Sequence, residues 1–130
     1  VINDAYNASF ESMKASLKVL AEYKEHRKIA ILGDMFELGD FAKELHENVG
    51  KEVAKNKIDI LIASGENSKY IVEKAKEGLK SENIYYLEDK EKIEELLLKI
   101  VKPNDVILFK ASNGMQFYKL AEKVVELWKK

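Results

Sequence analysis

The amino-acid sequence predicts an α/β fold: a single Rossmann-like domain whose mostly parallel β-sheet is covered by helices on both faces. Short apolar runs at 28–32 and 58–63 lack alternation of apolar and polar residues, which is typical of strands buried on both faces. Between such runs lie segments whose apolar residues recur every three or four positions, as in amphipathic helices. No internal repeat, low-complexity stretch or linker interrupts this alternation, so we expect one domain over residues 1–130.

The spacing of apolar residues also predicts the order of the elements. A first helix is expected over residues 10–20 with Ser9 as its N-cap, followed by a strand at 28–32. A second helix is expected to have Asp40 as its N-cap. The remaining expected elements are a strand at 58–63, a helix through Ile71, Ala75 and Leu79, a strand at 84–87, a helix between Asp89 and Pro103, a strand at 105–109, and a helix at 117–128.

Composition narrows the class of protein. Charged residues make up 35% of the chain but nearly cancel to a net charge of -1, so there is no electrostatic reason to expect a nucleic-acid partner. The chain has no cysteine, which excludes disulfides and zinc–thiolate sites and suits a reducing compartment. No apolar run is long enough to span a membrane. We expect a cytoplasmic protein, and the missing initiator methionine suggests a piece of a longer chain.

In open parallel sheets, ligands bind beyond the carboxyl ends of the strands, where loops lead into helix N-termini. We therefore expect the loops that follow the strands to gather at one edge of the sheet and to carry the chemistry. These loops are residues 4–12, 33–40, 64–68, 88–89 and 110–116.

The first of these loops contains Asp4 and Asn7 and runs into a helix whose free N–H groups can face an anion. Asp4 can accept hydrogen bonds from the hydroxyls of a sugar, and Asn7 can both donate and accept. The alternative is a capping loop in which Asn7 and Ser9 satisfy the start of the helix. Local chemistry alone favours the capping loop.

Asp34 and His46 are the polar candidates of the second loop and its helix. Asp34 directly follows a buried strand, so it can hold a substrate ammonium or a partner side chain, or else bond backbone amides in the turn. His46 lies alone on the following helix, and such a histidine is more often structural or exposed than a ligand.

The loop after the last strand brings together Lys110, Ser112 and Asn113, a cation and two hydrogen-bonding side chains. Lys110 can contact a carboxylate or a phosphate, or it can be a strand-end lysine whose ammonium reaches water. The local chemistry does not decide between these two roles.

Several motifs are absent from the sequence. It contains neither a G-x-x-x-x-G-K-S/T phosphate loop nor a G-x-G-x-x-G fingerprint, so nucleotide binding by this chain alone is unsupported. No serine has an evident base, and no spacing of His, Asp and Glu predicts a metal site. The residues by themselves predict an α/β domain with one polar loop edge.

Three segments together carry a resemblance to a known family. Residues 4–13 resemble the D-A-Y-N-A-N-P-x-S-M motif that opens the C-terminal domain of MurF-type ligases of the Mur ligase family. Residues 33–39, with His46 and the pair at 49–50, are similar to that domain's G-D-M-x-E-L-G and H-x-x-V-G segments, and residues 109–115 to its V-K-G-S-R-G-M stretch. The segments occur in the family's order and cover essentially the whole chain.

The resemblance implies an ATP-dependent amide ligation in peptidoglycan precursor synthesis. D-alanyl-D-alanine would be joined to a UDP-N-acetylmuramoyl-tripeptide through an acyl phosphate. The phosphate loop and the magnesium ligands would belong to a central ATPase domain, and the UDP-sugar site to an N-terminal domain. Neither of these domains is within this sequence, so we expect the chain alone to be inactive and to close over the central domain of the same polypeptide.

The resemblance also divides the polar loop residues between the two sides of the site. Asp4 and Asn7 would lie on the nucleotide side. Nearer the dipeptide or the reacting phosphate would lie three residues: Asp34, Lys110 and Ser112. His46 and Asn113 are weaker candidates.

The sequence departs from the family pattern at three places. Ser9-Phe10 stands where the family has Asn-Pro, Ala111 stands for a glycine, and Asn113 stands for an arginine. The loss of that arginine removes a cation able to clamp a carboxylate or phosphate, which leaves the amine substrate open. Two further hypotheses also stay open: a receiver-like signalling domain, and a non-catalytic α/β interaction module.

Overall fold

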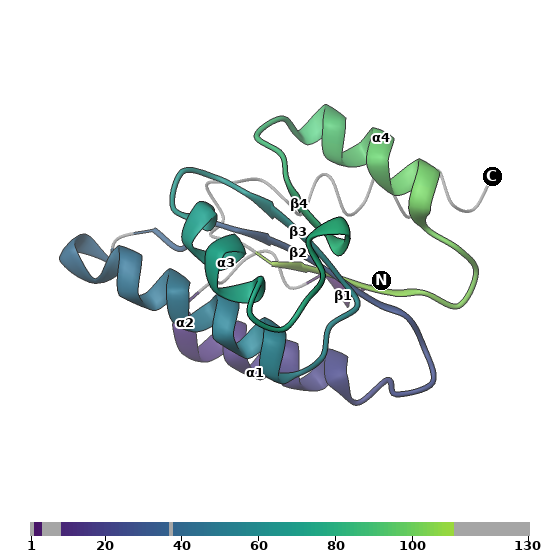
Figure 1. Ribbon diagram of the computed structural model, residues 1–130, viewed down its shortest axis with the longest axis horizontal. Coiled ribbons are helices and arrows are strands. Elements are labelled where there is room, and N and C mark those ends of the chain that lie inside the picture. The colour runs from purple at the N-terminus through teal and green to yellow at the C-terminus, as the bar shows by residue number, and fades with distance from the viewer. Residues whose placement is uncertain (1, 4–8, 37, 111–130) are drawn as a thin grey trace.

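Within the described residues, five parallel strands form one sheet in the order β1-β5-β2-β3-β4. The computed structural model describes residues 2–3, 9–36 and 38–110 (Figure 1). The strands are β1 (Ile2–Asn3), β2 (Lys28–Gly33), β3 (Ile60–Ser64), β4 (Ile84–Tyr86) and β5 (Val106–Lys110).

Helices cover both faces of this sheet. Figure 1 shows α1, α2 and α3 together on one face and α4 on the other. The helices are α1 (Phe10–Ala21), α2 (Ala42–Lys55), α3 (Ser68–Ala75) and α4 (Lys90–Ile100), with short 3-10 helices η1 (Gly39–Phe41) and η2 (Ser81–Asn83). The predicted fold class is therefore confirmed.

The core consists of two apolar layers, one on each side of the sheet. In β2, Ala30 and Leu32 pack toward α1, α2 and α3, whereas Ile29 and Ile31 pack toward α4. Successive side chains of a strand point to opposite faces, so both sets of positions must be apolar when both faces are covered. This is why the strand appears in the sequence as an unbroken apolar run.

Glycine allows α2 and α3 to approach closely. A Cβ atom at Gly50 of α2 would overlap the carbonyl oxygen of Ile71 in α3. Val49, beside this glycine, is buried in the core. The V-G pair of the H-x-x-V-G segment therefore has a packing role in this domain.

Two of the predicted helix caps are confirmed and one is wrong. The Ser9 side chain accepts a hydrogen bond from the Ser12 N–H at 3.2 Å, and Asp89 accepts one from the Glu91 N–H at 2.9 Å. Asp40 does not cap α2, because it lies inside η1, which begins at Gly39 with a φ of 58°. A left-handed residue at this point starts a tight turn before the helix.

Some boundaries also differ from the predicted ones. α3 ends at Ala75, and Leu79 packs into the core from the turns that follow it. β3 begins at Ile60, two residues later than predicted, and the two-residue strand β1 was not predicted. The helix predicted at 117–128 lies outside the described residues.

Candidate functional site

The carboxyl ends of the parallel strands lie at one edge of the sheet, as the predicted topology requires. Lys110, the last residue of β5, is in register with Leu32 of β2, and Asp34 follows that strand. Asp34 and Lys110 therefore lie at the same edge on neighbouring strands. Four of the other candidates, Asp4, Asn7, Ser112 and Asn113, lie outside the described residues.

Asp34 joins the loop after β2 to the start of α3. Its carboxylate accepts a hydrogen bond from the Asn67 N–H, with both oxygens at 3.1 Å, and one from the Ser68 hydroxyl at 2.8 Å. The side chain is buried, with the residue only 5% exposed. A carboxylate at this position also suits the positive end of the helix dipole. Of the two predicted roles, these contacts match the bonding of turn amides.

Gly65 is required next to this carboxylate. It adopts a φ of 119°, a conformation that L side chains rarely adopt. A Cβ atom at Gly65 would also overlap the carboxylate of Asp34. The two loops after β2 and β3 are therefore fitted to each other at a point where only glycine fits.

His46 of α2 is fully buried and uses both ring nitrogens. Nε2 accepts a hydrogen bond from the Met35 N–H at 3.0 Å, and Nδ1 lies 2.6 Å from the carbonyl oxygen of Ala42. This arrangement requires a neutral imidazole with its proton on Nδ1, because Nε2 must accept. His46 therefore has the structural role that is common for a lone helical histidine, and it holds the loop after β2.

Lys110 is also buried, with 1% of the residue exposed. Burial of an ammonium group is costly unless polar or charged groups compensate for the lost water. Lys110 does interact with other residues. It ends β5, which lies between β1 and β2, so its side chain begins at the candidate edge beside the loop after β2.

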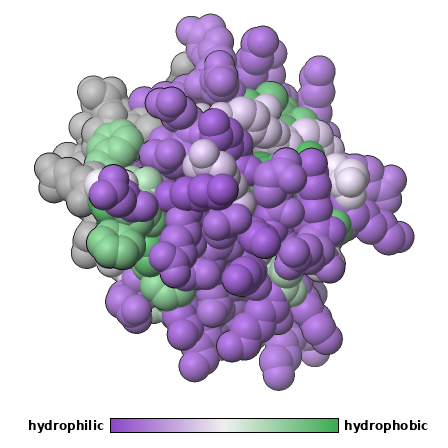
Figure 2. Space-filling model, turned by 60° about the vertical axis from the view of Figure 1, so that its left-hand side comes forward, coloured by the Kyte–Doolittle hydropathy of each residue, from purple (hydrophilic) through white to green (hydrophobic). Residues whose placement is uncertain are grey.

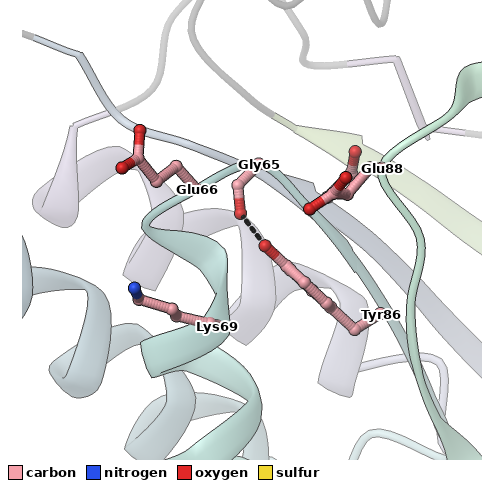
Figure 3. Close-up of a pocket in the computed structure, with 6 residues that line it drawn as sticks. Gly65, Glu66, Lys69, Tyr86 and Glu88 are labelled. Carbon is pink, nitrogen blue, oxygen red and sulfur yellow. Dashed lines mark hydrogen bonds between the residues drawn. The ribbon is translucent and has the colours of Figure 1, made fainter.

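An open pocket of about 560 Å³ lies beyond the carboxyl ends of β3 and β4 (Figure 3). The Tyr86 hydroxyl donates a hydrogen bond to the carbonyl oxygen of Gly65 at 2.6 Å and so ties β4 to the loop after β3. Side chains of both charges surround this contact. The lining residues are Ser64, Gly65, Glu66, Lys69, Tyr86 and Glu88.

Burial and three acidic side chains act on the Tyr86 hydroxyl in this pocket. Burial raises the pKa of Tyr86, and the negative charges of Glu88, Asp34 and Glu66 raise this pKa further. Tyr86 therefore remains protonated at neutral pH and keeps its hydrogen bond to the loop after β3.

The sequence analysis named the loops at 64–68 and 88–89 but no site residue within them. Glu66 and Glu88 follow the ends of β3 and β4, so their position at the edge is a signal that the strand pattern contains. The role of Tyr86 was not visible, because its partner Gly65 lies 21 residues away in the sequence.

The described residues contain no group of three or more His, Asp or Glu side chains placed to hold a metal ion. Among the same residues, no helix is long and apolar enough to cross a membrane.

A parallel sheet with two covered faces and a polar carboxyl edge defines a Rossmann-like domain that presents loops to a ligand or partner. The profile of the "Mur ligase, glutamate ligase domain" family matches residues 1–113. The chain belongs to this family, as the resemblance implied.

Similar proteins with a more specific name include a UDP-N-acetylmuramoyl-tripeptide–D-alanyl-D-alanine ligase from Bacillus subtilis, 32% identical over 127 residues. The alignment covers 97% of this chain and 28% of that ligase. A MurF ligase from Thermotoga maritima, solved with ADP, is 33% identical and has a TM-score of 0.73. That match covers 95% of this chain and 26% of the Thermotoga chain. A MurF from Acinetobacter baumannii has 26% identity and a TM-score of 0.82, covering 95% and 27% respectively. The chain thus spans little more than a quarter of these relatives.

Proposed function

We propose that residues 1–130 are the C-terminal domain of an ATP-dependent amide ligase of peptidoglycan precursor synthesis. The ligase joins D-alanyl-D-alanine to a UDP-N-acetylmuramoyl-tripeptide in the cytoplasm. ATP and Mg²⁺ bind mainly to a central domain of the same polypeptide, outside this sequence. The chain alone neither hydrolyses ATP nor forms the amide bond.

One observation carries this proposal: most of the chain aligns with relatives that are named as this ligase, and the alignment covers about a quarter of the length of each relative. The Thermotoga maritima relative was solved with ADP, which supports the use of ATP. The match to the Mur ligase family favours this function over the receiver-like domain and the non-catalytic module.

In the proposed reaction, a carboxylate oxygen of the tripeptide attacks the γ-phosphorus of ATP, which gives an acyl phosphate and ADP. The amine of the dipeptide then attacks the acyl carbon, and phosphate leaves as the amide forms. Both steps need water to be excluded, because water would hydrolyse the acyl phosphate. The proposed contribution of this domain is to close its carboxyl edge over the reacting groups.

The residues of this edge have proposed roles on two sides of the site. Lys110 is suited to the substrate side, because a buried ammonium can stabilise negative charge on a carboxylate or phosphate. Asp34 acts on the same side by holding the loop that begins α3. The other proposed residues are Asp4 and Asn7 on the nucleotide side, Ser112 on the substrate side, and Asn113 and His46 with weaker support.

The test is a ligation assay with the complete parent ligase and with the 130-residue chain. Each is incubated with ATP, Mg²⁺, UDP-N-acetylmuramoyl-tripeptide and D-alanyl-D-alanine, and the product is identified by mass spectrometry. We expect the parent to form the pentapeptide precursor with one phosphate released per bond, and the short chain to form none. A parent that releases no product, or a short chain that turns over, contradicts the proposal. Single D-amino acids in place of the dipeptide serve as the specificity control.

A further inference from the structure

Tyr86, the last residue of β4, reaches from its strand to the loop after β3. Its hydroxyl donates a hydrogen bond to the carbonyl oxygen of Gly65 at 2.6 Å (Figure 3). The preceding residue, Tyr85, packs against the apolar layer under α4, so the side chain of Tyr86 points to the opposite face, where α3 lies (Figure 1). Tyr86 is therefore placed to act on the loop that leads into α3.

This hydrogen bond forms where water can compete for both of its partners. Tyr86 is 37% exposed, and the surface on the side of the molecule at which α2 begins is mostly hydrophilic (Figure 2). A hydroxyl in such surroundings can bond to water instead, so its bond to a backbone carbonyl adds little to the stability of the domain. The bond therefore matters for the shape that it gives to the loop after β3.

The carbonyl group that Tyr86 binds belongs to a tight turn. The same oxygen of Gly65 accepts a hydrogen bond from the Ser68 N–H at 3.2 Å, which closes the turn at 65–68 before α3. Two donors thus fix the direction of this carbonyl group, and with it the plane of the peptide between Gly65 and Glu66. Rotation of that peptide would displace the residues of the turn that follow it.

The turn at 65–68 holds the carboxylate of Asp34. The Asn67 N–H donates to this carboxylate at 3.1 Å, and the Ser68 hydroxyl donates to it at 2.8 Å. The backbone of Gly65 lies against the same group, because a Cβ atom at that position would overlap the carboxylate. A shift of the turn would therefore move or release Asp34, which follows β2 beside the strand that ends with Lys110.

The charges agree with this arrangement. Burial raises the pKa of Tyr86 above its ordinary value of 10.0, and the negative charges of Glu88, Asp34 and Glu66 raise it further. The carboxylate of Asp34 is thus close enough for its charge to act on the hydroxyl that binds Gly65. Because that hydroxyl stays protonated at neutral pH, it remains a donor.

We propose that Tyr86 is a positioning residue of the ligase: its hydroxyl fixes the carbonyl group of Gly65, and the turn at 65–68 then holds the carboxylate of Asp34 in place on the substrate side of the site. This inference rests on the proposed function, which gives Asp34 its place in the site. Tyr86 acts through the turn and not by contact with the substrates.

The first experiment measures the coupling in the 130-residue chain and does not depend on activity. Tyr86→Phe removes only the hydroxyl, and the control Tyr85→Phe makes the same change on the other face of β4. Hydrogen exchange of the Asn67 amide, followed by nuclear magnetic resonance, should be about fivefold faster or more in Tyr86→Phe. In Tyr85→Phe it should change less than twofold. Equal exchange rates in the two variants overturn the proposal.

The converse measurement titrates Tyr86 in the same chain. Asp34→Asn removes a negative charge but keeps the size of the side chain, so the pKa of Tyr86 should fall. The resonance of the labelled Tyr86 ring carbon that carries the hydroxyl, recorded against pH, gives this pKa in both proteins. An unchanged pKa in Asp34→Asn would show that the carboxylate does not lie near the hydroxyl, and it overturns the proposal.

The third experiment measures the consequence in the parent ligase. Tyr86→Phe should lower kcat about fivefold or more, while KM for ATP stays within twofold, because the turn lies on the substrate side. Tyr85→Phe should leave kcat within twofold. In an Asp34→Ala background, Tyr86→Phe should change kcat less than twofold, because the carboxylate that it positions is gone.

Two kinetic results overturn the proposal. One is a normal kcat in Tyr86→Phe. The other is a loss of kcat that is undiminished in the Asp34→Ala background, which would show that Tyr86 acts by another route. A wild-type parent that forms no product refutes the proposed ligase instead, and the exchange and titration measurements in the 130-residue chain then decide whether Tyr86 holds the turn against Asp34.

Discussion

At the amino-terminal end of the sheet Arg27 pairs with Asp105, whereas at the carboxyl-terminal end Asp34 and His46 bind mainly backbone groups of neighbouring loops. Arg27 lies directly before β2 and Asp105 directly before β5, and Nη2 of Arg27 is 2.6 Å from Oδ2 of Asp105. The same guanidinium group donates to the carbonyl oxygen of Ile100. These contacts join one strand start to the next.

At the carboxyl end, the carboxylate of Asp34 accepts from the start of α3, and the imidazole of His46 joins two points on either side of η1. These contacts fix the shapes of loops. The amino end therefore joins the starts of neighbouring strands, whereas the carboxyl end holds loops of defined shape at the edge of the proposed site. Substitutions of single contacts at either end should change the free energy of unfolding of the 130-residue chain by different amounts.

The largest effect is expected for Gly65→Ala at the carboxyl end. The substitution forces a side chain into a φ of 119° and against the Asp34 carboxylate, which together should cost about 3–4 kcal/mol. Chemical denaturation measures the loss. The same substitution in an Asp34→Ala background should cost about 1–2 kcal/mol less, because the overlap is then gone while the strained backbone remains. Equal costs in both backgrounds would show that the two loops are not fitted to each other.

His46→Ala should cost about 3 kcal/mol, because it leaves a cavity and removes the acceptor of the buried Met35 N–H. Denaturant unfolding gives the size of the loss, and hydrogen exchange should show faster exchange of the Met35 amide. Glu44→Ala, an exposed position on the same helix, is the matched control and should change stability by no more than about 0.5 kcal/mol. A His46→Ala variant as stable as this control would contradict the role of the imidazole in holding the loop.

Asp105→Asn should cost about 2 kcal/mol at neutral pH, because the partly buried guanidinium of Arg27 loses its charged partner. Burial alone would raise the pKa of Asp105, but hydrogen bonds from Arg27 and from the Lys102 N–H, with the nearby positive charges, lower this pKa overall. A lowered pKa in the folded state means that the carboxylate contributes stability above its unfolded pKa of about 3.9.

The contribution of Asp105 is therefore lost as the pH falls through its folded-state pKa. The difference in free energy of unfolding between the wild type and Asp105→Asn, taken from denaturation curves, should be constant between about pH 5 and 8. This difference should shrink below about pH 4. A difference that widens on acidification would contradict the direction of the shift.

Ser9→Ala should have the smallest effect, about 1 kcal/mol, because it removes the N-cap of α1 but leaves the buried face of the helix intact. Thermal unfolding with circular dichroism checks it. Ser9→Asp, which keeps a capping oxygen, should retain most of the stability. Equal losses in both variants would argue against a capping role for Ser9.

The sequence predicted those features whose partners are close in the chain. Ser9 and Asp89 were identified as caps because their partners lie three and two residues away. Strands β2, β3 and β5 were visible because both faces of the sheet are covered, which leaves an unbroken apolar run in each. The prediction that Asp40 caps α2 was wrong because the left-handed turn at Gly39 begins a 3-10 helix before α2. Residue type does not determine that geometry.

The candidate site was less predictable, because its contacts join distant segments. Asp34 has its partners 33 and 34 residues away, so the sequence left open whether its carboxylate binds a ligand or a loop. His46 was predicted to be structural or exposed only from the general behaviour of helical histidines, and its two backbone partners depend on how the loop folds back. The pocket beside Tyr86 depends on the pairing of β3 with β4.

Protection of backbone amides from hydrogen exchange when ligands bind to the parent ligase tests most directly whether the carboxyl end faces the substrates. The measurement compares the parent with and without ATP, UDP-N-acetylmuramoyl-tripeptide and D-alanyl-D-alanine. Slower exchange should appear in peptides that cover residues 33–41 and 64–68, with no change in those that cover 24–28 and 101–105. Protection confined to the two amino-end peptides would contradict the account.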